Sequence, residues 1–259
     1  MKISVCADIF YYGEDLFNKL DKIKEYSDTI EFWSWHNKDI DRLKKYCDDN
    51  GLSVSCFCVD SNSEEKSAFI SKCALNSGKK EEFIDALKET VEVAKKLSAK
   101  SVITTIGDKI EGISIEEQIT NTKEVLNYVS DYLCKNDITL LVEPINTNER
   151  ADYLLPYIKD VIKLVREVNS PKIKILYDIY HQNMMRDFDL NEMIKNIDII
   201  GHIHIADVPG RNEVGTCKID YKKVLKALSD SDYSGFIGLE YVAVGDYKES
   251  VENIKKIIK

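Results

Sequence analysis

The sequence contains few of the residues that interrupt regular structure. Its 259 residues include four prolines and eleven glycines, and no stretch has the composition of a linker or a low-complexity tract. The seven cysteines, an odd number, stand at positions 6, 47, 56, 58, 73, 134 and 217. They form no C-x-x-C pair of the kind found in zinc ribbons and thioredoxin-like sites. We therefore expect reduced thiols, most of them packed in the interior.

Basic residues are also in the minority. The chain has 36 basic and 45 acidic side chains and a formal net charge of −9. Proteins that bind nucleic acids by neutralising phosphates carry clustered Lys and Arg, so nucleic acid is not an expected partner. The first apolar stretch already ends at Asp8, which fits neither a signal peptide nor a membrane span. We expect a cytoplasmic protein that does not bind membranes.

Short apolar runs rich in β-branched residues alternate with longer segments in which apolar residues recur at helical spacing. This pattern predicts eight strand-helix units around a parallel sheet. The expected strands are Ile3–Ala7, Thr29–Trp33, Ser53–Cys58, Ser101–Thr105, Thr139–Glu143, Ile173–Asp178, Ile199–Ala206 and Phe236–Tyr241. The expected helices are Asp15–Glu25, Asp39–Asp49, Glu81–Leu97, Ile115–Cys134, Tyr157–Val168, Leu190–Asn196, Tyr221–Leu228 and Tyr247–Ile258.

Eight such units in about 250 residues predict an α/β fold, a single (β/α)₈ TIM barrel with its active site at the C-terminal ends of the strands. A doubly wound sheet is the alternative, but no G-x-G-x-x-G motif follows the first strand. Asn50-Gly51 is a helix-ending signal, and Ser114 with Glu117 is a capping box that begins a helix. No domain boundary is evident, so we expect one domain over residues 1–259.

One connection is long for this scheme. Residues Val59 to Lys80 are rich in Ser, Asn, Glu and Lys. Loops of this length in compact domains are usually binding loops, lids or disordered segments. The sequence leaves two interpretations open here: a lid over the barrel mouth, or a surface loop without a functional role.

Four consecutive strands end in an ionisable residue. The apolar runs of the last four strands lead into Glu143, Asp178, His204 and Glu240. Neighbouring strands are about 4.8 Å apart, so inward-facing side chains at their ends can meet at one point. Two Glu, one Asp and one His suit a divalent cation such as Mn²⁺, Mg²⁺ or Co²⁺. The cation's charge would also explain how three acids coexist there.

Other residues in the same loops extend this candidate site. Arg211 could clamp a substrate carboxylate or phosphate, and His181 could bind a substrate hydroxyl or carbonyl oxygen; a surface arginine and a loop histidine are the simpler interpretations. Trp33, with Trp35 and His36, could form an aromatic wall or simply pack. His202 shares a strand face with His204, and we expect it to be a buried, hydrogen-bonded core residue.

The motifs at these strand ends resemble those of one known family. They are Glu31-Phe32-Trp33, Val142-Glu143-Pro144-Ile145-Asn146-Thr147, Leu176-Tyr177-Asp178-Ile179-Tyr180-His181, Gly201-His202-Ile203-His204-Ile205-Ala206-Asp207-Val208-Pro209-Gly210-Arg211 and Gly238-Leu239-Glu240-Tyr241. In this order they resemble the hydroxypyruvate isomerase-like family of the xylose isomerase-like TIM-barrel superfamily. The resemblance covers nearly the whole chain, and the H-I-H-I-A-D-V-P-G-R combination is its most specific part.

The resemblance implies an isomerase or epimerase that uses one divalent metal ion and no organic cofactor. The implied metal ligands are Glu143, Asp178, His204 and Glu240, the two Glu residues also carry the proton, and His181 and Arg211 contact substrate. Glu149 stands where related ketose 3-epimerases place a substrate-binding Glu. After Arg211 the sequence N-E-V-G-T-C-K-I-D-Y departs from the family's H-E-P-G-T-G-E-I-N-Y, with Lys218 in place of an acid.

The resulting hypothesis is a metal-dependent isomerase of small hydroxy-keto acids or sugars that works through a metal-bound cis-enediolate. The alternatives are a ketose 3-epimerase, an inosose-type dehydratase and a non-catalytic sugar-binding barrel. An abasic-site nuclease on the same barrel is disfavoured, because its zinc cluster uses several more histidines than the four present here. The expected partner is a small-molecule keto acid or sugar, and the sequence leaves homo-oligomerisation open.

Overall fold

Eight parallel strands form one sheet. A computed structural model describes residues 1–258 of the chain. The strands are β1 Lys2–Cys6, β2 Thr29–Phe32, β3 Ser53–Phe57, β4 Ser101–Thr105, β5 Thr139–Glu143, β6 Ile173–Asp178, β7 Ile200–Ile205 and β8 Phe236–Leu239. They lie in the order β3-β2-β1-β8-β7-β6-β5-β4, with every ladder parallel. The first strand therefore pairs with the last, as barrel closure requires.

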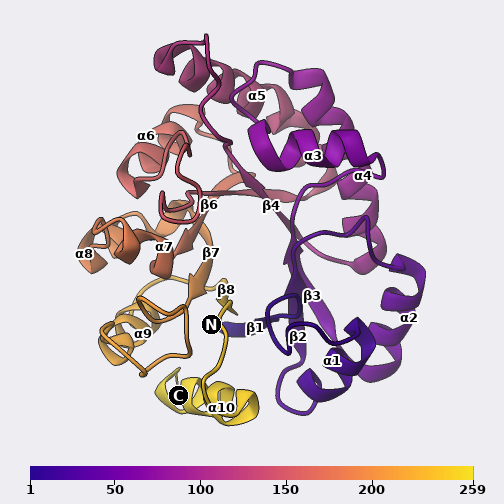
Figure 1. Ribbon diagram of the computed structural model, residues 1–259, viewed down its shortest axis with the longest axis vertical. Helices are drawn as coiled ribbons and strands as arrows, with labels where there is room; N and C mark the ends of the chain where they lie inside the picture. Colours follow the sequence, from indigo (N-terminus) through magenta and orange to yellow (C-terminus); the bar gives the residue numbers. More distant parts are fainter. Residues whose placement is uncertain (259) are drawn as a thin grey trace.

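The ends of this sheet, β3 and β4, meet at an isolated bridge. Cys58 pairs with Ile103, and the backbone N–H of Val59 donates to the Ile103 carbonyl oxygen at 2.7 Å. The sheet is thus nearly closed, and the helices form a ring around it (Figure 1). The predicted (β/α)₈ barrel is confirmed, and each observed strand begins and ends within two residues of its predicted limits.

The helices follow the strands in the expected alternation. They are α1 Leu16–Ile23, α2 Ile40–Asn50, α3 Glu64–Cys73, α4 Lys80–Leu97, α5 Ile115–Asn136, α6 Ile158–Val168, α7 Ile179–Met184, α8 Leu190–Lys195, α9 Tyr221–Ser229 and α10 Tyr247–Ile258. Gly51 ends α2 at a φ of 67°, and the Ser114 hydroxyl at the start of α5 accepts a hydrogen bond from the Glu117 N–H. Both predicted helix boundaries are confirmed. None of the helices within residues 1–258 combines the length and apolar character that crossing a membrane requires.

The structure corrects the expectation for the long connection from Val59 to Lys80, because ten of its residues form α3. Ser63 precedes the helix and accepts a hydrogen bond from the Lys66 N–H, and two glutamates occupy its first turn. Ile70 is the only residue of α3 that is fully buried. A helix with so little apolar surface lacks the periodic stripe by which helices are recognised in a sequence. Its capping serine was the available signal.

A second short helix, α7, was also not expected. It begins directly after Asp178, whose Oδ1 accepts hydrogen bonds from the N–H groups of Tyr180 and His181. Asp178 therefore ends a strand and caps a helix at once. This double role fixes the position of its side chain at the barrel mouth.

Side chains alternate between the two faces of a strand, so residues two apart point the same way. Inside the barrel this produces two layers. The mouth layer consists of Glu143, Asp178, His204 and Glu240, at or just beyond the strand ends. Beneath it lies what we term the buried layer, which consists of Glu31, Cys56, His202 and Gly238. His202 and Gly238 each precede a mouth-layer residue by two positions.

Candidate active site

The four side chains of the mouth layer converge. One ligand atom from each of Glu143, Asp178, His204 and Glu240 lies within 4.8 Å of all the others, and all four residues are buried. His204 Nδ1 is 3.1 Å from Glu240 Oε2 and 3.8 Å from Glu143 Oε1. Because the ladders β5-β6, β6-β7 and β7-β8 bring these strand ends together, the predicted cluster exists as a spatial unit.

The chemistry of this cluster fits a divalent cation. Burial raises the pKa of Glu143 to about 8, and the carboxylates of Glu240 and Asp178 contribute further to this rise, although His204 and Arg211 oppose it. Both ring nitrogens of His204 are buried and lack a hydrogen-bond partner within residues 1–258; Nδ1 is the one that faces the carboxylates of the mouth layer, and when it carries no proton its lone pair is available to a metal. A cation bound between them would offset the repulsion among the carboxylates and use this lone pair. The mouth layer therefore has the donors and the surplus negative charge that a metal site needs.

Glu240 is the most constrained of the carboxylates. Its Oε1 accepts a hydrogen bond from the indole N–H of Trp33 at 2.5 Å, and its Oε2 accepts one from Arg211 at 2.5 Å. Burial acts to raise its pKa, but Arg211 and His204 together hold that pKa below the ordinary value for a glutamate. Trp33 is 40% exposed, so it forms part of the rim of the site as well as binding Glu240.

Arg211 lies across the site and binds the protein's own acids. Its Nη1 donates to both oxygens of Glu149, at 3.2 and 3.1 Å, and its Nη2 donates to Asp178 Oδ2 at 3.3 Å as well as to Glu240. The guanidinium group also stands over the Tyr180 ring, 4.9 Å from its centroid. The structure thus brings Arg211 and Glu149 together as a pair at the mouth.

His181 lies beside the mouth layer in a defined orientation. Its Nε2 is 3.4 Å from Asp178 Oδ2 and 3.9 Å from Glu143 Oε1, and its Nδ1 is 2.6 Å from the Asn146 amide nitrogen. Asn146 Oδ1 accepts hydrogen bonds from two backbone N–H groups, those of Asn148 and Glu149. The amide nitrogen must then be the donor to His181 Nδ1, which leaves the ring proton on Nε2. Burial lowers the pKa of His181, which favours this neutral form.

The expected aromatic wall is only partly present. Trp33 lies at the mouth, but Trp35 is buried and donates its indole N–H to Thr90 Oγ1 at 3.1 Å, so it packs in the core. His36 pairs with Asp60, with Nδ1 and Oδ2 2.6 Å apart. Strand β2 ends at Phe32, so the two tryptophans lie in the turn that follows, where strand alternation no longer applies and their side chains diverge.

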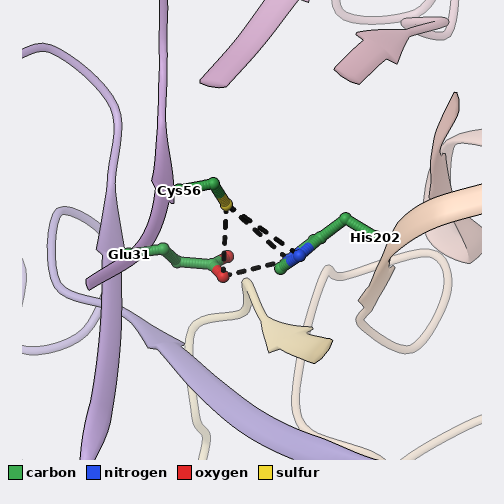
Figure 2. Close-up of side chains that lie close together, drawn as sticks. All are labelled: Glu31, Cys56 and His202. Atoms are coloured by element: carbon green, nitrogen blue, oxygen red, sulfur yellow. Dashed lines mark hydrogen bonds and ion pairs between the residues drawn. The ribbon is translucent and has the colours of Figure 1, made fainter. Parts of the chain in front are cut away.

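Sequence reasoning missed two residues that touch the site. Asn146 stands three positions after Glu143, in the Glu-Pro-Ile-Asn run, and holds His181. Glu31, on β2, is buried, and its Oε1 lies 2.7 Å from His204 Nε2. Glu31, Cys56 and His202 come from three strands and point toward one another (Figure 2). A carboxylate inside an otherwise apolar strand was the available signal for Glu31.

Hollows lie at both ends of the barrel. One of about 290 Å³ lies at the mouth between β2, β3, β4 and α3, and Trp33 and Arg150 are among its lining residues. Another, of about 390 Å³, is lined by Trp33 and Asp8 among others. A hollow of about 680 Å³ is lined by the starts of β1, β2, β3 and β8, which is the end of a TIM barrel that contributes to stability rather than to chemistry. We therefore associate the two hollows that share Trp33 with the candidate site, because Trp33 donates to Glu240.

Comparisons with known proteins identify the family. The family model of the xylose isomerase-like TIM barrel matches residues 20–257. Hydroxypyruvate isomerase of Escherichia coli (strain K12) is 34% identical over 212 residues, which cover 82% of this chain and 81% of that protein.

Two solved structures show the same fold at lower identity. The AP endonuclease, family 2, of Brucella melitensis has a TM-score of 0.90 at 22% identity and covers 99% of both chains. The 3-keto-D-glucoside 4-epimerase YcjR of E. coli has a TM-score of 0.80 at 18% identity, covering 98% of this chain and 100% of that one. At these identities the likeness concerns the fold alone. The family match and the sequence identity together place this chain in the hydroxypyruvate isomerase-like family of xylose isomerase-like TIM barrels.

Proposed function

We propose that the protein is a divalent-metal-dependent isomerase of small hydroxy-keto acids, with hydroxypyruvate as the first candidate substrate. The observation that carries this proposal is the convergence of three carboxylates and one imidazole from four consecutive strands within 4.8 Å. Membership of the hydroxypyruvate isomerase-like family supports an isomerase or epimerase, and the donor set supports the metal. Mn²⁺, Mg²⁺ and Co²⁺ all accept such oxygen-rich donors.

Glu143, Asp178, His204 and Glu240 would hold the cation. When bound, it would polarise the carbonyl and the neighbouring hydroxyl of the substrate and so acidify the C–H bond between them. The remaining work falls to the side chains. A carboxylate that also binds a metal is a weakened base, so one oxygen of each glutamate must stay available for the proton.

Glu143 and Glu240 are the proposed proton carriers. With hydroxypyruvate, one carboxylate removes a proton from the hydroxymethyl carbon, which leaves a cis-enediolate. The other returns a proton to the adjacent carbon, and the hydroxyl proton moves to the former carbonyl oxygen, so that the product is 2-hydroxy-3-oxopropanoate. Positioned proton transfer of this kind typically contributes about 10²- to 10⁴-fold in rate.

His181 and Arg211 are the proposed substrate contacts. The Nε2–H of His181 points toward the mouth layer, where it can donate to a substrate oxygen. Arg211 can bind the substrate carboxylate through two parallel hydrogen bonds. To do so it must give up part of its contact with Glu149 or Glu240, so substrate binding and rearrangement of Arg211 are linked.

The test is an activity panel on protein stripped of metal and then reloaded. We expect hydroxypyruvate to be converted to 2-hydroxy-3-oxopropanoate with Mn²⁺, Mg²⁺ or Co²⁺ added, and activity to disappear with a chelator and return with excess metal. Full activity in the chelated protein would refute the metal requirement. Turnover of no keto acid or ketose would instead favour the inosose-type dehydratase or the sugar-binding barrel.

A ketose 3-epimerase is the second candidate. The position of Glu149 against Arg211 at the mouth favours it, because an additional carboxylate there could bind the hydroxyls of a longer sugar. Both reactions need the same metal and the same two glutamates. Product analysis in heavy water separates them: an isomerase places deuterium on the neighbouring carbon, whereas an epimerase places it on the carbon that lost its proton.

A further inference from the structure

One buried carboxylate beneath the mouth layer contacts both histidines of β7. Glu31 is 2% exposed. Its Oε1 lies 2.7 Å from His204 Nε2, and its Oε2 lies 3.0 Å from His202 Nε2. The Ser55 hydroxyl donates a further hydrogen bond to Oε2 at 3.3 Å. Glu31 therefore links the buried layer to a proposed metal ligand.

The barrel makes specific room for this contact. Gly238 on β8 faces the same space, and a Cβ added there would lie 2.5 Å from His204 Cδ2, 2.6 Å from Glu31 Oε1 and 2.7 Å from His202 Nε2. Real Cβ atoms do not approach other atoms so closely, so any other residue would force the group apart. Three strands thus share one close-packed arrangement whose centre is the Glu31 carboxylate.

The two ring nitrogens of His204 face different surroundings. Nδ1 faces Glu240 and Glu143, and Nε2 faces Glu31. A histidine that binds a metal through one nitrogen commonly directs the other N–H toward a carboxylate, which fixes the ring and raises its basicity as a ligand. We propose that Glu31, held in place by His202, is a positioning residue that orients His204 as a metal ligand through Nδ1. This inference rests on the metal site of the proposed function.

A second cation between Glu31, Cys56 and His202 is the competing interpretation, since these three also lie within 4.8 Å of one another. The atoms involved have other partners, however. Glu31 Oε2 accepts from Ser55 and faces His202 Nε2 directly, whereas Cys56 Sγ is 3.9 Å from Glu31 Oε2 and from each ring nitrogen of His202 (Figure 2). The geometry therefore favours a bonded carboxylate-imidazole pair.

The test compares Mn²⁺ binding by calorimetry in wild-type protein and in Glu31→Gln. The substitution keeps the shape of the side chain and removes its charge, so we expect Mn²⁺ to bind about 10- to 100-fold more weakly. The matched control is Cys56→Ala, which alters a neighbour of Glu31 that does not touch His204, and here we expect Mn²⁺ affinity within about twofold of wild type. Thermal unfolding of the metal-free proteins shows whether each variant is folded at the temperature of the titration.

The outcomes are distinguishable. Wild-type protein that binds no Mn²⁺, Mg²⁺ or Co²⁺ would refute the proposed function, on which this inference depends. Wild-type protein that binds Mn²⁺, together with folded Glu31→Gln that binds it equally well, would overturn this inference alone. Uptake of two ions per chain, reduced to one in Cys56→Ala, would also overturn it, because Glu31 would then itself be a ligand.

A second variant keeps the inference testable if Glu31→Gln does not fold. His202→Asn removes the group that holds Glu31 and leaves the carboxylate in place. We expect a smaller loss of Mn²⁺ affinity, less than about tenfold, and a changed visible absorption of the Co²⁺-loaded protein, because the field at His204 changes. A Co²⁺ spectrum and Mn²⁺ affinity identical to wild type would contradict the positioning role.

Discussion

Two histidines on one face of β7, two residues apart, have different surroundings. His204, in the mouth layer, faces two carboxylates through Nδ1 and a third through Nε2. His202, in the buried layer, faces Glu31 and the thiol of Cys56. The one carboxylate of the buried layer lies against a histidine of each layer, whereas the mouth layer gathers three carboxylates around a single histidine. The histidine at the end of β7 is therefore available for chemistry, whereas the histidine two residues earlier supports it from beneath.

Neutralising a carboxylate of the mouth layer should have the largest effect. In Glu143→Gln or Glu240→Gln the side chain keeps its shape but can no longer accept a proton. We expect kcat for the proposed isomerisation to fall by about 10²- to 10⁴-fold. Steady-state kinetics at saturating Mn²⁺ measures this, with bound metal determined in parallel. If either variant retains most of its activity while its metal content is normal, that residue is not a proton carrier.

Replacing the hydrogen-bond donor to His181 with an acceptor should have the next largest effect on catalysis. Asn146→Asp keeps an oxygen for the N–H groups of Asn148 and Glu149 but replaces the donor to His181 Nδ1 with an acceptor. The ring proton should move to Nδ1, which leaves Nε2 without the hydrogen that substrate binding needs. An isolated lost hydrogen bond to a charged or reacting group costs about 1.5–3 kcal/mol, so kcat/KM should fall by about 10- to 100-fold. An unchanged kcat/KM in folded protein would show that His181 does not donate to substrate.

Filling the space within the buried layer should lower the stability of the protein. Gly238→Ala places a Cβ against His202, His204 and Glu31. Overpacking of this kind usually costs about 1–3 kcal/mol, so the free energy of unfolding measured in urea should fall by that amount. Gly245→Ala is the matched control, because its added Cβ would meet only Glu213 Oε1, at 3.5 Å. Equal stability of the two variants would show that the packing around Glu31 is loose.

The smallest effect concerns the thiols. All seven cysteines are free; Cys134 and Cys217 are exposed, and Cys56 of the buried layer is enclosed. Burial, the dominant influence, raises the pKa of the Cys56 thiol well above its ordinary value, so it should not react as a thiolate. In native protein a chromogenic disulfide reagent should modify Cys134 and Cys217 first and reach Cys56 only after unfolding. Rapid labelling of Cys56, read by mass spectrometry, would show that the buried layer opens readily.

Much of the barrel could be predicted from the sequence. The β-branched runs were sufficient to locate the strands, because parallel strands that are buried on both faces are continuously apolar. The mouth layer was also predictable, since an ionisable residue directly after such a run stands at a strand end. Helix α3 was not, because it buries only Ile70 and carries no apolar stripe. Asn146 was missed because its role depends on two backbone N–H groups that only the folded loop brings to it.

The sequence by itself determined the alternation of strands and helices and the four ionisable strand ends, because both depend on local patterns of burial. Tertiary structure decided what those residues face. Glu31 is 173 residues from His204 in the chain, and only the closure of the sheet through β1 and β8 brings β2 opposite β7. The same closure places Trp33 against Glu240, whereas Arg211 meets Glu149 because β6 pairs with both β5 and β7. No local pattern contains such pairs, because their distance depends on the curvature of the whole barrel.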